Sequence, residues 1–158
     1  MVIKLSIQYM LVFQMLEDVI NNANDNIWNM KTGGHVFWQQ ILHSLMGSHF
    51  WFRLSNEKFI EPFIEKGYYP ELEKDPENIM EKAELIKYKE EVRTIVEEYF
   101  KNKDDNWLKE PSILYNKLSN LEIIMMQIRH LMYHVGFCSA LLRENQATQI
   151  KWIDYYGK

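Results

Sequence analysis

Hydrophobic residues recur along this chain with the spacing of amphipathic helices, and four long segments show the pattern. The first predicted helix begins after Ser6 and ends in the asparagine-rich stretch 21–26, and one face of it carries Tyr9, Phe13, Leu16 and Ile20. The second runs from about Gly34 to Leu54 and is apolar nearly all round. A helix of that kind has to be covered on both sides.

Capping residues mark the third and fourth predicted helices. Asp75 is a suitable N-cap followed by Pro76 at the first helical position, and this third helix continues to about Phe100. Ser119 and Glu122 have the spacing of a capping box, and the fourth helix continues from there to about Arg143.

Residues 55–74 form a long connection between the second and third predicted helices. Pro62, Gly67 and Pro70 interrupt it, and a short helical turn is expected around residues 59–64. Connections of this length often shape a binding site. We find no strand pattern and no internal repeat, so the sequence predicts an all-α protein, a four-helix bundle that forms a single domain over residues 1–158.

Composition narrows the functional classes. The 158 residues, 47% of them hydrophobic, suit one domain with one core, and a net charge of -4 does not favour nucleic acid as a partner. Residues 32–52 carry no formal charge but contain three histidines and several other polar side chains, so we expect no membrane span. Cys138 is the only cysteine, which excludes an intramolecular disulfide and favours a reducing cytoplasm.

Two histidines of the fourth predicted helix share one face. At 100° per residue that face carries Ile123, Met126, Gln127, His130, His134, Phe137, Cys138 and Leu141. Residues four apart on a helix have Cβ atoms about 5–6 Å apart, so two ring nitrogens can converge on one metal ion. The pair alone is a weak signal, because core histidines are often satisfied by backbone carbonyls.

The second predicted helix offers candidates for a third ligand, and periodicity does not choose between them. His43 shares a side with Gly47, whereas His49 shares one with Trp38. If His43 faces the bundle axis, Gly47 one turn later leaves open space for a cavity. His35, at the helix start, is interpreted as a surface or capping residue.

These histidines also support a resemblance to a known family. The run Arg-His-Leu-Met-Tyr-His-Val-Gly at residues 129–136, followed by Ala-Leu-Leu-Arg at 140–143, together with His-Ser-Leu at 43–45, resembles the DinB-like/YfiT-like superfamily of metal-dependent proteins. The resemblance spans nearly the whole chain. It implies that His43, His130 and His134 hold one divalent metal ion, and it resolves the choice against His49.

The sequence departs from the family pattern at two neighbouring positions. Phe137 stands where relatives commonly have a polar residue, and Cys138 stands where an apolar residue is usual. Both departures bear on the substrate chemistry more than on the metal.

Three neutral imidazoles leave an ion its full charge and at least one open position, which is typical of a catalytic site. Such an ion lowers the pKa of a bound water or thiol. Zinc and nickel are the favoured metals. The resemblance implies that some relatives are S-transferases that use low-molecular-weight thiols.

We therefore predict a divalent-metal-dependent S-transferase or hydrolase that acts on a small molecule, with no catalytic residue assigned beyond the ligands. The alternative is a non-catalytic, dimeric helical-bundle interaction protein with a structural or vestigial histidine site.

Four further residues are expected near the predicted site. Gln127 and Tyr133 border the inward face and are candidates to orient the ligands, although packing is the more ordinary interpretation. Cys138, one turn beyond His134, is a candidate thiol for the cavity, but a lone buried cysteine usually behaves as a small hydrophobe. Gly47 is expected to leave space beside the metal.

The apolar second helix also suggests a homodimer, because one side of each helix in a bundle faces outward. Alternatively, the long connection covers that side.

Overall fold

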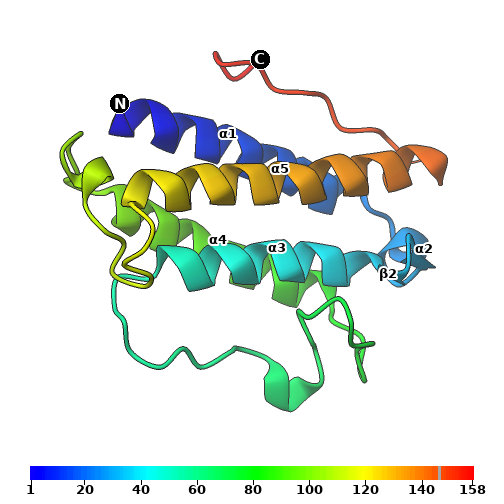
Figure 1. Ribbon diagram of the computed structural model, residues 1–158. Coiled ribbons are helices and arrows are strands. Elements are labelled where there is room, and N and C mark those ends of the chain that lie inside the picture. Colours follow the sequence, from blue (N-terminus) through cyan, green and yellow to red (C-terminus); the bar gives the residue numbers. More distant parts are fainter. Residues whose placement is uncertain (146) are drawn as a thin grey trace.

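The computed structural model describes residues 1–145 and 147–158 and consists mainly of four long helices packed together (Figure 1). They are α1 (Val2–Asn22), α3 (Phe37–Phe52), α4 (Lys82–Phe100) and α5 (Asn120–Glu144). Helix α5 packs on both α1 and α3, and α3 also packs on α4. The predicted four-helix bundle and its long second connection are confirmed.

Short elements join the long helices. They are α2 (Asp25–Trp28), the strands β1 (Lys31–Thr32) and β2 (His35–Val36), and the 3₁₀ helices η1 (Ile64–Lys66) and η2 (Trp107–Lys109). The two strands form an antiparallel hairpin that the sequence pattern did not predict. Gly33 and Gly34 make its turn at φ 63° and 95°. Because an α-helix does not admit these φ values, α3 begins at Phe37 and not at Gly34.

The core lies where the apolar faces of the four helices meet. The predicted face of α1 is buried at all four of its positions, Tyr9, Phe13, Leu16 and Ile20. Burial of a side chain of this size stabilises the fold by about 1.5–3 kcal/mol. Polar contacts also lie within this core; the Tyr9 hydroxyl, for example, donates to Ser48 Oγ at 2.6 Å.

The predicted capping box of the last helix is confirmed. Ser119 Oγ accepts a hydrogen bond from the Glu122 N–H, and the Glu122 carboxylate accepts one from the Ser119 N–H at 2.8 Å. The predicted start of the first helix after Ser6 is wrong, because α1 begins at Val2. The carboxylate of Asp105 accepts from the Val2 N–H at 2.8 Å, so a distant residue caps this helix.

The predicted start of the third helix at Asp75 is also wrong. Asp75 does not act as a cap, because its carboxylate pairs with Lys31 Nζ at 2.7 Å, and α4 begins at Lys82. The connection therefore spans 53–81, longer than the predicted 55–74. Its helical turn is η1, which lies at the end of the predicted stretch 59–64 and beyond it.

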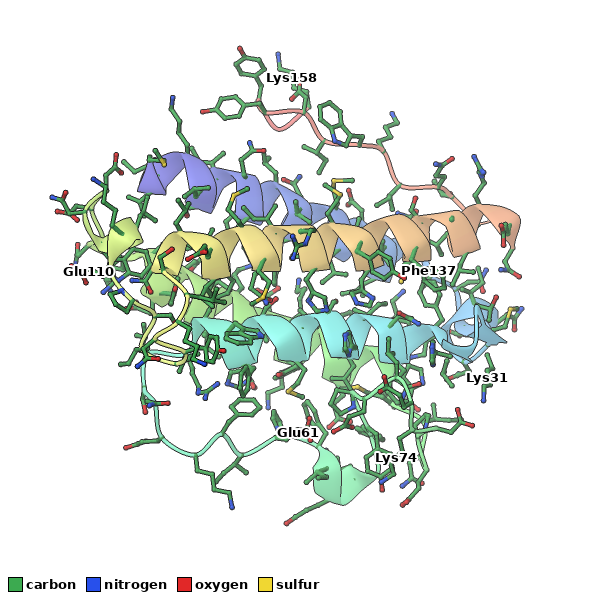
Figure 2. All side chains as sticks on the ribbon, in the orientation of Figure 1. Lys31, Glu61, Lys74, Glu110, Phe137 and Lys158 are labelled. Carbon is green, nitrogen blue, oxygen red and sulfur yellow. The ribbon has the colours of Figure 1, made fainter. Side chains whose placement is uncertain are left out.

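The connection covers the outer side of α3, where Figure 2 shows Glu61 and Lys74. Gln39 on α3 is fully buried, and its Nε2 lies 2.7–3.1 Å from the carbonyl oxygens of Tyr69, Glu71 and Lys74. This covering is the alternative to a dimer that the sequence left open, and the homodimer stays a prediction. Within the described chain, the helices include none that is both long and apolar enough to cross a membrane.

One ion-pair network joins α1 to α4. Lys89 Nζ and Arg93 Nη2 each lie 2.5 Å from Glu17 Oε1. Burial by itself raises the pKa of Glu17, but the hydrogen bonds from Arg93 and Lys89 outweigh it and hold the pKa below its ordinary value. A carboxylate of this kind contributes stability that is lost as the pH falls through the lowered pKa.

We expect Glu17→Gln to lower the free energy of unfolding at neutral pH by about 1 kcal/mol. Below the ordinary carboxyl pKa the difference from the wild type should shrink, because the wild type loses the same ion pairs by protonation. Urea unfolding at a series of pH values measures both effects. If the difference in free energy of unfolding between the wild type and Glu17→Gln stays constant down to low pH, the ion pairs of Glu17 do not stabilise the fold.

Candidate metal centre

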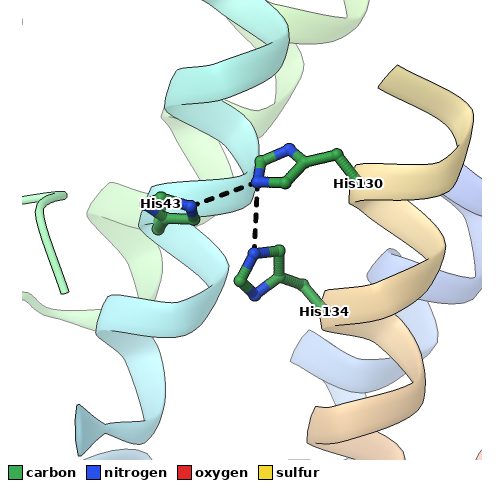
Figure 3. A group of neighbouring side chains, drawn as sticks. All are labelled: His43, His130 and His134. Carbon is green, nitrogen blue, oxygen red and sulfur yellow. Dashed lines mark hydrogen bonds between the residues drawn. The ribbon is translucent and has the colours of Figure 1, made fainter. Parts of the chain in front are cut away.

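Three histidine side chains meet at the interface between α3 and α5 (Figure 3). His43 comes from α3, and His130 and His134 come from successive turns of α5. The Nε2 atom of His130 lies 3.1 Å from Nε2 of His43 and 3.2 Å from Nε2 of His134. Each residue offers one ligand atom within 4.8 Å of the others, so the group can hold a metal ion.

Oxygen acceptors orient two of the three rings. The Nδ1 atom of His43 lies 2.9 Å from the carbonyl oxygen of Pro70, which can only accept, so Nδ1 carries the proton and Nε2 keeps its lone pair. Nδ1 of His134 lies 3.1 Å from Oε1 of the buried Gln40, so this ring too carries its proton on Nδ1 and keeps a lone pair on Nε2. Metal-binding histidines are commonly held in this way, with the second ring nitrogen donating to an oxygen.

Replacing Gln40 with leucine should therefore weaken metal binding, because the His134 ring loses the acceptor that sets its tautomer. Changes of this kind cost about 10–100-fold in metal affinity. The affinity is measured by competition with a chromophoric chelator. Asn106, which lies outside this site at the start of η2, supplies a matched amide-to-leucine control, Asn106→Leu. Equal affinities in the Gln40 variant and the control would show that Gln40 does not orient the ligand.

The third ring fits the site because Gly47 has no side chain. A Cβ atom built on Gly47 would lie 2.8 Å from Cε1 and 3.1 Å from Nδ1 of His130, too close for an undisturbed ring. In the part of the chain that the structure describes, Nδ1 of His130 and Oε1 of Gln127 are both buried without a hydrogen-bond partner. Gln127 also lies beside Gly47, because its Oε1 would be 3.7 Å from a Cβ atom built on that glycine.

Burial keeps two of the three rings, those of His130 and His134, uncharged at neutral pH. Desolvation, with a smaller contribution from the neighbouring His43, lowers the pKa of His130 to about 4 and that of His134 to about 3. Both rings are therefore neutral near pH 7, and a neutral imidazole is the form that binds a metal.

A cleft of about 800 Å³ opens onto two of the ligands. Helix α3 forms one side of it and the connection forms the other, and its lining consists of His43, Met46, Gly47, Phe50, Trp51, Arg53, Asn56, Glu57, Lys58, Phe59, Glu61, Pro70, Glu71, Glu73 and His130. A smaller hollow of about 410 Å³ touches His130 from the side of Gln127 and Tyr133. A small molecule can thus reach His43 and His130.

The other candidate residues lie at different distances from this group. Tyr133 is 68% exposed at the edge of the smaller hollow. Cys138 is fully buried in the core, and burial raises the pKa of its thiol to about 12, so it packs as a small hydrophobe. His49 lies apart from the group, with Nδ1 2.9 Å from the Tyr88 hydroxyl. His35 lies on β2, half-buried.

Sequence reasoning missed Gln40 and Pro70, the two residues that orient ligands. Gln40 has a weak signal, since it is a polar residue on a helix that is otherwise apolar nearly all round. Pro70 has none, because it acts through its backbone carbonyl and becomes a partner of His43 only when the connection folds back on α3.

Comparisons with family models, curated proteins and solved structures find no match to this chain. Fold and site together define a mostly helical protein with three histidines that can hold a metal ion. This is consistent with the resemblance to the DinB-like superfamily, which rests on the motifs alone.

Proposed function

We propose that this protein is a metal-dependent enzyme of the DinB-like kind, in which His43, His130 and His134 hold one divalent ion, zinc or nickel. The observation that carries the proposal is the convergence of three Nε2 atoms beside an open cleft, with two of the rings oriented by oxygen acceptors. An all-imidazole set fits a divalent ion that keeps an open position.

The substrate is a small molecule that binds in the cleft along α3. When bound, the ion supplies a water or thiol of lowered pKa and polarises a substrate oxygen. Burial holds His130 and His134 neutral, and oxygen acceptors orient the rings of His43 and His134. Apolar side chains such as Met46 and Phe50 line the cleft beside them. The resemblance favours transfer to or from a low-molecular-weight thiol, or hydrolysis, as the reaction.

The test is elemental analysis of protein purified without an affinity tag, alongside His130→Ala. We expect about one equivalent of a divalent metal in the wild type and a loss of that metal in the variant, because two histidines rarely hold an ion alone. If the wild type contains no metal and binds none on addition near neutral pH, the proposal is wrong, and the non-catalytic helical-bundle alternative replaces it.

A further inference from the structure

An arginine lies in the same cleft as the histidines, stacked on aromatic rings. Arg53 follows the last residue of α3, and its guanidinium carbon lies 4.0 Å from the centre of the Phe50 ring and 5.4 Å from that of Phe59. Arg53, Phe50 and Phe59 all line the cleft onto which His43 and His130 open. Stacking on two rings holds the guanidinium in place before any ligand arrives.

Most hydrogen-bond donors of this guanidinium are unused by the part of the chain that the structure describes. Nη1 donates to the Phe50 carbonyl at 2.5 Å, while Nε is buried without a partner among those residues. Arg53 pairs with no carboxylate within 4.0 Å among residues 1–145 and 147–158, although several glutamates line the same cleft. A guanidinium offers five N–H donors in a planar fork that matches an oxyanion, so this one is suited to a ligand.

The glutamates of the cleft do not make it a cation site. Glu57, Glu71 and Glu73 are exposed at its rim, where water screens their charges. Glu61 is half-buried, and burial together with the charge of Glu71 raises its pKa, so it holds a proton more readily than an ordinary glutamate. Two of the aromatic faces that would attract a cationic ligand, those of Phe50 and Phe59, already carry Arg53.

We propose that Arg53 binds an oxyanion group of the substrate, a carboxylate or a phosphate, while the other end of the substrate reaches the histidines. This inference rests on the proposed function. Phe50, over which Arg53 stacks, is seven residues after His43 on α3, a distance of about 10 Å along a helix axis. The substrate class is therefore a small molecule with an apolar body and a terminal oxyanion about 10 Å from its reacting atom.

The metal-free protein tests the oxyanion site by itself. Isothermal titration calorimetry with octanoate, octyl phosphate and octylamine should show binding of one or both anions and weaker binding of the amine. Arg53→Gln should weaken anion binding about tenfold or more, because charge-assisted hydrogen bonds are lost. The matched control Lys58→Gln removes an exposed positive charge from the same cleft and should change little. Preference for the amine, or equal losses in the two variants, would overturn the inference.

The cobalt-loaded protein tests whether the two ends of the cleft act together. An octane thiol that ends in a carboxylate should bind about tenfold more tightly than one that ends in a hydroxyl, as read from the thiolate-to-cobalt charge-transfer band. Arg53→Gln should remove this difference and keep the band. If the protein holds no cobalt, the metal proposal fails while calorimetry still decides on Arg53. If the band forms with equal affinity for both thiols, the spanning substrate is wrong.

Discussion

Adding zinc to the metal-free protein should raise its melting temperature, and His43→Ala should abolish that rise. A ligand that binds only the folded state at a hundredfold excess over its Kd stabilises it by about 2.7 kcal/mol. For a domain of this size that corresponds to an increase of about 5–10 °C. The increase is measured by differential scanning calorimetry with and without zinc, for the wild type and each variant.

His49→Ala is the matched control for this experiment. His49 lies on the same helix as His43, and its Nδ1 lies 2.9 Å from the Tyr88 hydroxyl, apart from the three converging rings. Its loss should lower the starting melting temperature and preserve the increase with zinc. An equal increase in melting temperature in the wild type and His43→Ala would show that zinc binds elsewhere. If His49→Ala also loses the increase, the choice of His43 over His49 as the ligand is contradicted.

A single methyl group at Gly47 should lower the metal affinity, although Gly47 is not itself a ligand. Because a Cβ there would lie 2.8 Å from Cε1 of His130, the ring has to turn away from the point that it shares with His43 and His134. We expect Gly47→Ala to lower metal affinity by about 10–100-fold, in the range seen when ligand orientation is lost. Chelator competition gives the affinity, and circular dichroism verifies that the bundle still folds.

Gly136→Ala makes the same change on α5 without the clash. A Cβ at this exposed position meets no described atom within 4 Å. The variant should bind metal like the wild type and gain about 0.5–1 kcal/mol in stability, since alanine favours a helix over glycine. If both glycine variants retain full affinity, the contact between Gly47 and His130 does not matter for binding.

The four long helices were predictable because hydrophobic spacing and local capping residues specify them. The Ser119 capping box is local in sequence, and the structure contains it as predicted. The predicted helix starts after Ser6 and at Asp75 were wrong because these two boundaries do not depend on local sequence. Asp105 caps α1 from a distance, and Lys31 pairs with Asp75, so both boundaries depend on contacts between residues far apart in the chain.

The candidate site likewise has a part that local sequence predicts and a part that depends on how the helices pack. The shared face of His130 and His134 follows from a spacing of four residues on one helix. The preference for His43 over His49 came from the family resemblance, because both lie on a helix that is apolar nearly all round. The oxygen acceptors on Gln40 and Pro70 depend on how α5 and the connection pack against α3, which local sequence does not specify.

The connection between α3 and α4 contains two segments with different freedom to change. Residues 69–74 are held to α3 through the side chain of Gln39, and within them Pro70 sets the ring of His43. Residues 54–57 are exposed, and two of them, Asn56 and Glu57, line the cleft. They include no partner of the three histidines among the described contacts. Insertions or substitutions in residues 54–57 can therefore reshape what the cleft accepts while the metal ligands keep their geometry, which makes this segment the natural place to redesign specificity.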